Sequence, residues 1–316
     1  MTTGPIISTQ GLTRLFGDKL AVDHLTFSVE EGEVFGFLGH NGAGKTTTIR
    51  LLNGVLDPSG GTAQVLGLSP TSDGPALRRR TGVLTETPSV DERLTARENL
   101  RIYAELYGVP RERTKSTVDE LLELFELRDR ADQKVGGYSS GMKRRLALAR
   151  ALIHDPEVLF LDEPTGALDP IAAHHVHEMI TRLSKERKHT VFLCTHNLAE
   201  AQKLCGRVAV LEHGRLLAMG PPAELAAQVG LGGSIEIEVS PDSSTLALAT
   251  LRNGPGLQAV LSTEGLITVQ GIMRERVPDV LASLVAAGVR VYRVAPQEPS
   301  LEDIYFALHG DKGGQA

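Results

Sequence analysis

The sequence predicts an α/β protein with a second, smaller α+β domain. A glycine-rich loop lies between a short apolar run and a helical segment, and unbroken apolar runs of strand length recur further along the chain. The order of elements then changes near residue 230. Apolar runs without alternation are typical of parallel strands that helices cover on both faces. We therefore expect a parallel-sheet core with an antiparallel β subdomain and a helical subdomain, followed by an α+β domain of ferredoxin-like order.

The glycine-rich loop spans residues 39–47 and fits the pattern G-x-x-x-x-G-K-[ST]. An apolar run precedes it and a helical segment follows it, which is the context of a phosphate-binding loop. Backbone N–H groups of such a loop and the positive end of its helix bind phosphate oxygens. We expect Lys45 to reach the β- and γ-phosphates and the Thr46 hydroxyl to bind Mg²⁺. The predicted nucleotide-binding residues of the loop are Asn41, Gly42, Ala43, Gly44, Lys45, Thr46 and Thr47.

Composition is that of an ordinary globular protein and limits the partners. The 316 residues are 41% hydrophobic and 23% charged, with a net charge of −6, which argues against a general nucleic-acid-binding surface. The two cysteines, Cys194 and Cys205, are too few for a disulfide framework, and we expect both to be reduced in the cytosol. No apolar run approaches the roughly 18 residues that a membrane span needs. We therefore expect any membrane role to depend on a partner protein.

The first thirty residues show the two-residue alternation of antiparallel strands, with turns at Gly17-Asp18 and Glu31-Gly32. Phe16 stands directly before the first turn. An aromatic ring there can stack on a nucleotide base, but its position alone favours a core residue of this small sheet.

Helical patterns fill the region from about residue 92 to residue 155. Thr95 and Glu98 form a capping box at the start of the first helix, which stops at Gly108. A second helix is expected over residues 114–127, and a third begins near Ser139. These helices predict a helical subdomain inserted between two strands of the sheet.

Two carboxylates and a histidine follow apolar runs of strand length. Asp162 and Glu163 end the run that begins at residue 158, and His196 ends the run that begins at residue 191. In open α/β sheets, ligands bind at the carboxyl ends of the strands. We expect Asp162 to bind Mg²⁺, Glu163 to accept a proton from an attacking water, and His196 to hold that water or the γ-phosphate. The alternative interpretation is a pair of carboxylates that caps a neighbouring helix. The phosphate-binding loop in the same chain favours the catalytic interpretation over this one.

A second anion site is predicted where hydroxyls and a glycine open the third helix, at Ser139, Ser140 and Gly141. One chain then carries two half-sites for the same phosphate. Two copies of the chain that face each other with ATP between them would account for both.

With these motifs, residues 6–230 resemble an ATP-binding-cassette (ABC) ATPase, and every motif of that family is present in order. Residues 39–47 match its Walker A loop, residues 139–141 lie where its signature lies, and residues 158–162 match Walker B. Ala167-Leu168-Asp169 matches the D-loop, and His196 matches the switch histidine. The resemblance implies a P-loop ATPase core that binds ATP and Mg²⁺, and a head-to-tail dimer of two cassettes that closes on two ATP molecules. We expect this dimer to be a homodimer.

The resemblance also assigns a role to each matched residue. It implies that Phe16 stacks on the base, in contrast to the expectation from position alone. The implied catalytic residues are Glu163 and His196, and the implied metal ligands are Thr46, Asp162 and Glu86. Nucleotide contacts beyond the loop are implied for Phe16, Glu86, Ser139, Ser140, Gly141 and Asp169.

Three positions depart from the family pattern. Glu86 stands where the family has glutamine, so this side chain can ligate Mg²⁺ but cannot donate a hydrogen bond to the attacking water. Ser140 replaces the usual glycine, and its Cβ can loosen the approach of the backbone to phosphate. Met142 replaces the usual glutamine. We expect real but slow hydrolysis.

The order β-α-β-β-α-β is predicted beyond residue 230, without a catalytic constellation. This region resembles the extra domain of the cassette subunits of bacterial exporters for drugs, antibiotics, lipids or polysaccharides. We therefore expect two domains, residues 1–230 for nucleotide binding and residues 231–316 for an accessory role in dimerisation.

The resemblance implies an ATPase subunit that drives separate transmembrane permease subunits, at the cytoplasmic face of the cell membrane. The alternative is a soluble ABC ATPase that acts on ribosomes or nucleic acid. Such proteins carry two cassettes, coiled coils or zinc modules, and the sequence shows one cassette and none of these. No nucleic-acid partner is expected.

Overall fold

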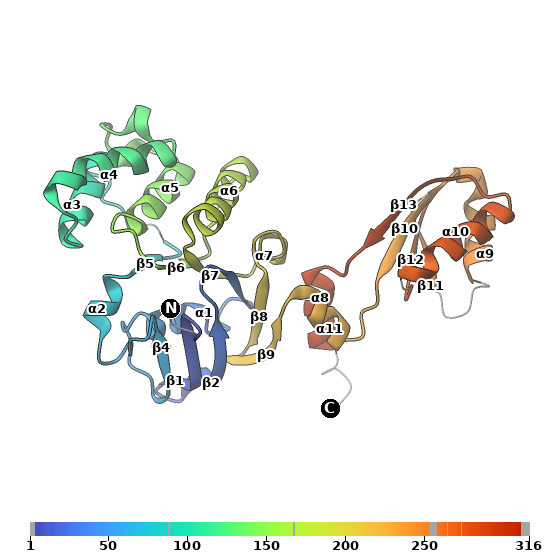
Figure 1. Ribbon diagram of the computed structural model, residues 1–316, viewed down its shortest axis with the longest axis horizontal. Coiled ribbons are helices and arrows are strands. Elements are labelled where there is room, and N and C mark those ends of the chain that lie inside the picture. Colours follow the sequence, from blue (N-terminus) through green and yellow to red (C-terminus); the bar gives the residue numbers. More distant parts are fainter. Residues whose placement is uncertain are drawn as a thin grey trace. The chain divides into compact units, whose positions relative to one another are not determined.

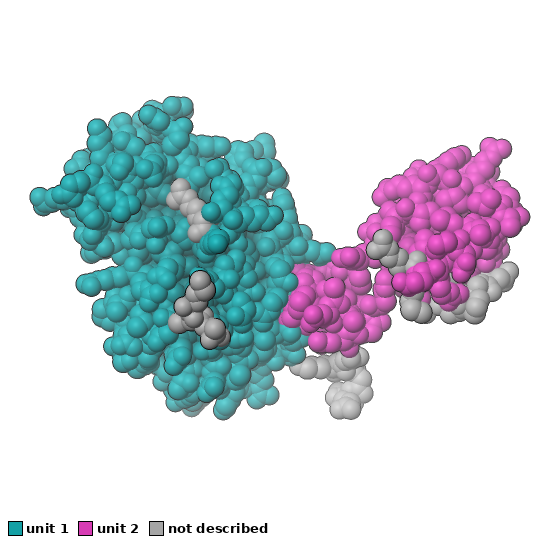
Figure 2. Space-filling model, in the orientation of Figure 1, with its two compact units in different colours: residues 1–219 teal, residues 220–316 magenta. Residues whose placement is uncertain are grey.

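The computed structural model describes residues 4–87, 89–166, 168–252, 258–263, 265–272 and 274–310. The chain divides into two compact units, Met1–Met219 and Gly220–Ala316 (Figure 2). This division falls before helix α8 (Pro222–Gln228), whereas the boundary expected from the sequence, between residues 230 and 231, falls after it. Helix α8 belongs to the second unit because it packs against the last helix, α11 (Leu301–Gly310).

A six-stranded sheet forms the centre of the first unit, with the strand order β5-β6-β7-β3-β8-β9. Strand β3 pairs in parallel with both β7 and β8, and β6 pairs in parallel with both β5 and β7. The loops that follow β3, β6 and β7 therefore emerge at one edge of the sheet. The strands are β3 (Val34–Leu38), β5 (Thr81–Leu84), β6 (Val158–Asp162), β7 (Thr190–Thr195), β8 (Arg207–Glu212) and β9 (Arg215–Gly220).

Every residue of β3, β6 and β7 is buried, as the unbroken apolar runs predict. Helix α1 (Lys45–Leu52) contacts β6, and helices α6 (Pro170–Arg187) and α7 (Leu198–Leu204) contact β7. Short helix α2 (Gly74–Arg78) contacts β5. The strand ends at the phosphate-binding edge are thus held by rigid packing.

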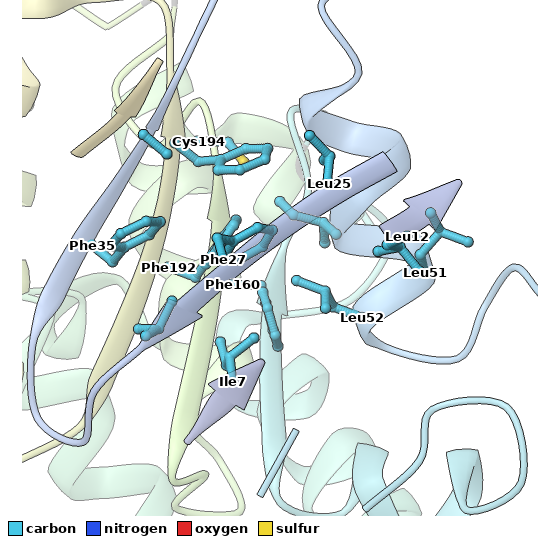
Figure 3. Packing of buried hydrophobic residues seen from close by; sticks show 14 of the residues in the cluster. Ile7, Leu12, Leu25, Phe27, Phe35, Leu51, Leu52, Phe160, Phe192 and Cys194 are labelled. Carbon is cyan, nitrogen blue, oxygen red and sulfur yellow. The ribbon is translucent and has the colours of Figure 1, made fainter. Parts of the chain in front are cut away.

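An antiparallel sheet of three strands, in the order β2-β1-β4, completes the core of this unit (Figure 1). Its strands are β1 (Ile7–Phe16), β2 (Lys19–Val29) and β4 (Gly60–Val65). Apolar side chains of both sheets share one cluster, in which aromatic rings lie face to face or tilted (Figure 3). The rings belong to Phe27, Phe35, Phe37, Phe160 and Phe192, with centroids 4.9–6.0 Å apart.

Three α-helices of the described chain lie between β5 and β6 and form a separate group in space (Figure 1). They are α3 (Ala96–Leu106), α4 (Arg111–Leu124) and α5 (Ser140–Ala151). The predicted capping box is present, since Thr95 accepts a hydrogen bond from the Glu98 N–H and the Glu98 carboxylate accepts one from the Thr95 N–H. Helix α4 begins and ends three residues earlier than expected, because Pro110 forms its N-terminal cap and Glu126 adopts a positive φ of 53° beyond its end.

The second unit contains a four-stranded antiparallel sheet in the order β11-β12-β10-β13. Its elements follow the chain as β10 (Ser234–Val239), α9 (Ser244–Arg252), β11 (Gln258–Thr263), β12 (Leu266–Gln270), α10 (Val277–Ala286) and β13 (Val291–Gln297). Apolar residues of the sheet and of α9 and α10 share a core of their own. None of the helices in the described ranges combines the length and hydrophobicity that a membrane crossing requires.

Candidate functional site

The glycine-rich loop connects β3 to α1 as predicted, and two of its glycines adopt positive φ. Gly42 has φ 88° and Gly44 has φ 103°, a region that favours glycine. A Cβ on Gly44 would lie 2.5 Å from the Ala21 carbonyl oxygen, so this position also lacks room for a side chain. Ala43 is fully buried beneath the loop. The loop can therefore present its backbone N–H groups to an anion at the start of α1.

Lys45 is buried and its ammonium group lies at the centre of the site. Lys45 Nζ donates a hydrogen bond of 2.6 Å to the Gly39 carbonyl and one of 3.3 Å to the His40 carbonyl. It also lies 3.3 Å from Glu163 Oε1. A fixed cation at this place can balance the charge of a polyphosphate and of the carboxylate beside it.

Thr46 and Asp162 join the loop to the end of β6. The Thr46 hydroxyl donates a hydrogen bond of 2.7 Å to Asp162 Oδ2. Burial raises the pKa of the Asp162 carboxyl, and the Glu163 carboxylate adds to this, while the Thr46 hydrogen bond and the Lys45 charge oppose it. A buried carboxylate oxygen beside a hydroxyl is a donor set that suits Mg²⁺. The residues present therefore fit a magnesium ion.

Glu163 and His196 meet because β6 and β7 are neighbours. The Glu163 N–H donates a hydrogen bond of 2.9 Å to the Cys194 carbonyl, which fixes the end of β6 to β7. His196 Nδ1 then lies 2.9 Å from Glu163 Oε2. Glu163 has a φ of 50°, which is an uncommon conformation for a residue with a side chain.

A cleft of about 580 Å³ opens beside the loop and collects most of the predicted residues of the site. Both carboxylates of the Walker B end line it, so the loop and the strand end face one space. Phe16 and Glu86 also line it, although they come from other strand ends. The lining residues predicted from the sequence are Phe16, Asn41, Gly42, Gly44, Lys45, Thr46, Thr47, Glu86, Asp162 and Glu163.

Phe16 is 43% exposed at the mouth of this cleft, which is unlike a core residue of the small sheet. The Arg14 guanidinium lies over its ring, 4.6 Å from the centroid. A flat, accessible ring next to the phosphate loop can stack on a base.

The residues of the predicted second half-site do not line this cleft. Ser139 caps the N-terminus of α5 and accepts a hydrogen bond of 3.2 Å from the Met142 N–H, and Ser140 is exposed. Asp169 caps α6 by accepting hydrogen bonds from Ile171 and Ala172. An added Cβ on Gly141 would lie 3.1 Å from the Ala172 side chain, so the starts of α5 and α6 are close together. Ala167 lies outside the described residues.

Sequence reasoning missed three residues near the site. Lys19 and Ala21 line the cleft from β2, and the only signal for them was their position just after Phe16. Arg144 is buried in α5 and donates hydrogen bonds to the backbone carbonyls of Glu86 and Pro164, in the loops that follow β5 and β6. Because its partners are backbone atoms, their residue types carried no signal.

A phosphate loop, a hydroxyl paired with a buried aspartate, and a glutamate that a lysine and a histidine contact define a P-loop nucleoside triphosphatase. Comparison with known proteins makes this class more specific. The chain matches the family model described as ABC transporter over residues 22–166.

Two curated relatives match nearly the whole chain. The bacitracin transport ATP-binding protein BcrA of Bacillus licheniformis is 36% identical over 305 residues, covering 96% of this chain and 97% of that protein. The Nod factor export ATP-binding protein I of Rhizobium sp. (strain N33) is 39% identical over 304 residues, covering 96% and 97%.

Solved structures agree. An ATP binding subunit of an ABC transporter superposes with a TM-score of 0.65 and 31% identity, covering 71% of this chain and 93% of that one. The cbiO1 protein of Clostridium perfringens, part of an ABC transporter complex, superposes with a TM-score of 0.65 and 27% identity, covering 71% and 91%. The chain belongs to the ABC transporter family, as the order of its motifs predicts. It is an ATP-binding subunit of that family and an ATPase.

Proposed function

We propose that this chain is the ATPase subunit of a bacterial exporter, with the cleft beside residues 39–47 as its ATP site. The observation that carries the assignment is Glu163, whose carboxylate lies 3.3 Å from Lys45 and 2.9 Å from His196 at the edge of that cleft. The name of one relative, for bacitracin transport, supports a role in transport, and the name of the other, for Nod factor export, supports the outward direction.

Hydrolysis in this proposal uses Glu163 as the general base. Glu163 takes a proton from a water as the water oxygen attacks the γ-phosphorus, and the bond between the γ-phosphorus and the bridging oxygen breaks to release ADP. His196 holds Glu163 and the transferred phosphoryl group in place, and Lys45 balances the charge. Thr46 and Asp162, with Glu86, would hold the Mg²⁺ ion, which neutralises charge on the phosphate oxygens. Phe16 stacks on the base.

Each ATP site in the proposal is shared by two identical chains arranged head to tail. Support comes from the helix start at Ser139, Ser140 and Gly141, where both serines are exposed and none of the three lines the cleft of its own chain. An exposed helix N-terminus with a capping hydroxyl is suited to the γ-phosphate held by another chain. Asp169, exposed at the adjacent start of α6, lies on the same side.

A mixing experiment tests the shared site. Lys45→Ala chains and Ser139→Ala chains are each expected to lose ATPase activity as homodimers. In a mixed dimer, one of the two sites combines an intact loop from one chain with an intact Ser139 from the other, so activity should return to about a quarter of the wild-type value in an equal mixture. A mixture no more active than its two components would contradict the head-to-tail arrangement.

Glu163→Gln tests the catalytic assignment itself. We expect this variant to bind ATP, to accumulate as a dimer in light scattering, and to lose roughly 100-fold or more in kcat. Undiminished turnover in purified dimer or in dimer with its membrane partner would show that Glu163 is not the base.

The partner in this proposal is a pair of transmembrane permease subunits, which would place the chain at the cytoplasmic face of the cell membrane. A tagged chain should then co-purify from detergent-solubilised membranes with a protein of several apolar spans. Co-sedimentation with ribosomes or nucleic acid instead would favour the soluble alternative, which the net charge of −6 argues against.

The second unit is proposed to stabilise the dimer by packing against its twin. A chain that ends at Met219 tests this better than one that ends at Gly230, because the longer form would keep α8 without its partner α11. Equal dimerisation and turnover of the shortened and full chains would contradict the proposal.

A further inference from the structure

Arg144 is a buried cation in the helical subdomain, and its guanidinium group contacts two loops that border the proposed ATP site. It lies on the second turn of α5, the helix that begins at Ser139 and Ser140, and it is only 2% exposed. Arginine is rarely this buried unless its guanidinium is fully paired. The identity of its partners therefore indicates what the residue is for.

The guanidinium donates to four backbone carbonyl oxygens in two loops. Nη1 donates to Thr85 at 2.9 Å and to Glu86 at 2.7 Å, in the loop that follows β5. Nε donates to Pro164 at 2.9 Å, and Nη2 donates to Glu163, in the loop that follows β6. Four of its five N–H groups are used in this way.

One planar group thus ties together the two loops that carry Glu86 and Glu163. Glu86 and Glu163 line the same cleft, and the pairing of β5 with β6 ends before them, at Leu84 and Leu161. Glu163 needs such support because its φ of 50° is strained for a residue with a side chain. Hydrogen bonds to its own carbonyl and to that of Pro164 hold this conformation.

The bonds of Arg144 leave the carboxylate of Glu163 to other partners. Its oxygens lie near Lys45 and His196, while Arg144 takes only the backbone oxygen of the same residue. Burial lowers the pKa of the Arg144 guanidinium, and the charges of Asp162, Glu163 and Glu86 oppose this. An arginine remains charged under these conditions, so it also offsets the repulsion among those carboxylates.

We propose that Arg144 is a positioning residue for ATP hydrolysis, which fixes the Glu86 and Glu163 loops relative to each other from helix α5. The inference rests on the proposed role of Glu163 as the base. Arg144 does not touch the phosphate loop, so its loss should misplace Glu163 without removing the groups that bind ATP. Because Ser139 caps α5, the side chain of Arg144 also links the start of that helix to the base.

The test compares Arg144→Gln with Arg145→Gln in the full chain. Arg145 is the matched control, because it lies on the same helix and is also largely buried, but its bonds go to Phe125 and Glu126 within the helical subdomain. For Arg144→Gln we expect kcat to fall about 100-fold, the loss typical of misplacing a catalytic group by about 1 Å. Its KM for ATP and its affinity for a fluorescent ATP analogue should stay within about two-fold of wild type.

A combined loss of ATP binding and turnover in Arg144→Gln would show a merely structural role and overturn the proposal, as would a kcat loss of equal size in Arg145→Gln. Arg144→Lys keeps the charge but has no planar fork, so it should recover less than about a tenth of the activity. Full recovery of kcat in Arg144→Lys would mean that the positive charge alone is sufficient for activity and that the planar guanidinium is not needed. Glu163→Gln, measured alongside, distinguishes the failure of the proposed base from the failure of the positioning role. A fully active Glu163→Gln would show that Glu163 is not the base. An inactive Glu163→Gln together with an active Arg144→Gln would reject only the positioning role of Arg144.

Discussion

Glu163 Oε2 lies 2.9 Å from His196 Nδ1, and this contact joins the ends of two strands that are more than thirty residues apart in the chain. It exists because β6 and β7 are paired in parallel, so that the residues after Asp162 and Thr195 emerge side by side. The same pairing leaves the other oxygen of Glu163 within 3.3 Å of Lys45. A base that is held from two sides has a single orientation toward the cleft.

Replacing His196 should therefore impair chemistry more than binding. For His196→Ala we expect kcat to fall about 100-fold, the usual contribution of a group that positions a general base, with little change in KM. Steady-state ATPase assays measure both constants. His174→Ala is the control, because the His174 side chain is 56% exposed on the second turn of α6 and pairs with Glu178 instead of Glu163. A His196→Ala variant with a kcat within two-fold of wild type would mean that the contact with Glu163 does not contribute to catalysis, since a two-fold change corresponds to a very small difference in the activation barrier.

Glu86 offers a test of the departure from the family pattern. Its side chain lines the cleft but has no N–H group to donate to a water. Glu86→Gln supplies that donor, and one added hydrogen bond of about 1 kcal/mol should raise kcat by about five-fold. The Mg²⁺ concentration for half-maximal activity should rise, since an anionic ligand is lost. Glu92→Gln, whose carboxylate pairs with Lys143 outside the cleft, should change neither value. A fall in kcat for Glu86→Gln would show that the acidic ligand is the better one here.

Asp162 should make stability depend on pH in the absence of metal. Burial raises the pKa of this carboxyl in the folded state, so folding favours the protonated form. Its contribution to stability is then fully present below the unfolded pKa of 3.8 and is lost as the pH rises through the higher folded pKa. In EDTA, Asp162→Asn should raise the melting temperature at pH 7 and lose this advantage near pH 4. Thermal unfolding at both pH values measures this, with exposed Asp129→Asn as the control. A lower melting temperature of Asp162→Asn at pH 7 would contradict the expected sign of the stability change.

Phe192 tests the aromatic cluster beneath the site. Its ring lies 4.9 Å from that of Phe37 and 5.6 Å from that of Phe160, and it is fully buried. Phe192→Ala should lower the free energy of unfolding by about 3–5 kcal/mol, because it removes buried contacts and leaves a cavity. Urea unfolding followed by circular dichroism gives the value. Phe306→Ala, at a position that is 64% exposed, should cost less than about 1 kcal/mol.

Much of the core could be predicted because its signals are local. The loop at residues 39–47 and the capping box at Thr95 each depend on a few consecutive residues. Unbroken apolar runs identified β3, β6 and β7, because a strand that is covered on both faces has no polar side to alternate. These features would be recognisable in any sequence that carried them.

Boundaries were predicted less well, because they depend on packing partners. Helix α4 ends where Glu126 takes a positive φ, and no residue there marks that change in the sequence. Helix α8 was assigned to the first domain by its place in the chain, whereas its contact with α11, more than seventy residues later, puts it in the second unit.

The order of residue types along the chain determines the phosphate loop, the apolar runs of the strands and the family, because each of these is a pattern of residues that are close together in the sequence. Only the tertiary structure shows that Glu163 contacts His196 and Lys45, and that Arg144 connects the Glu86 and Glu163 loops. The physical reason is that strand pairing sets the first relation and side-chain bonds to backbone carbonyls set the second. A carbonyl oxygen is the same in every residue, so its partner leaves no mark on the sequence.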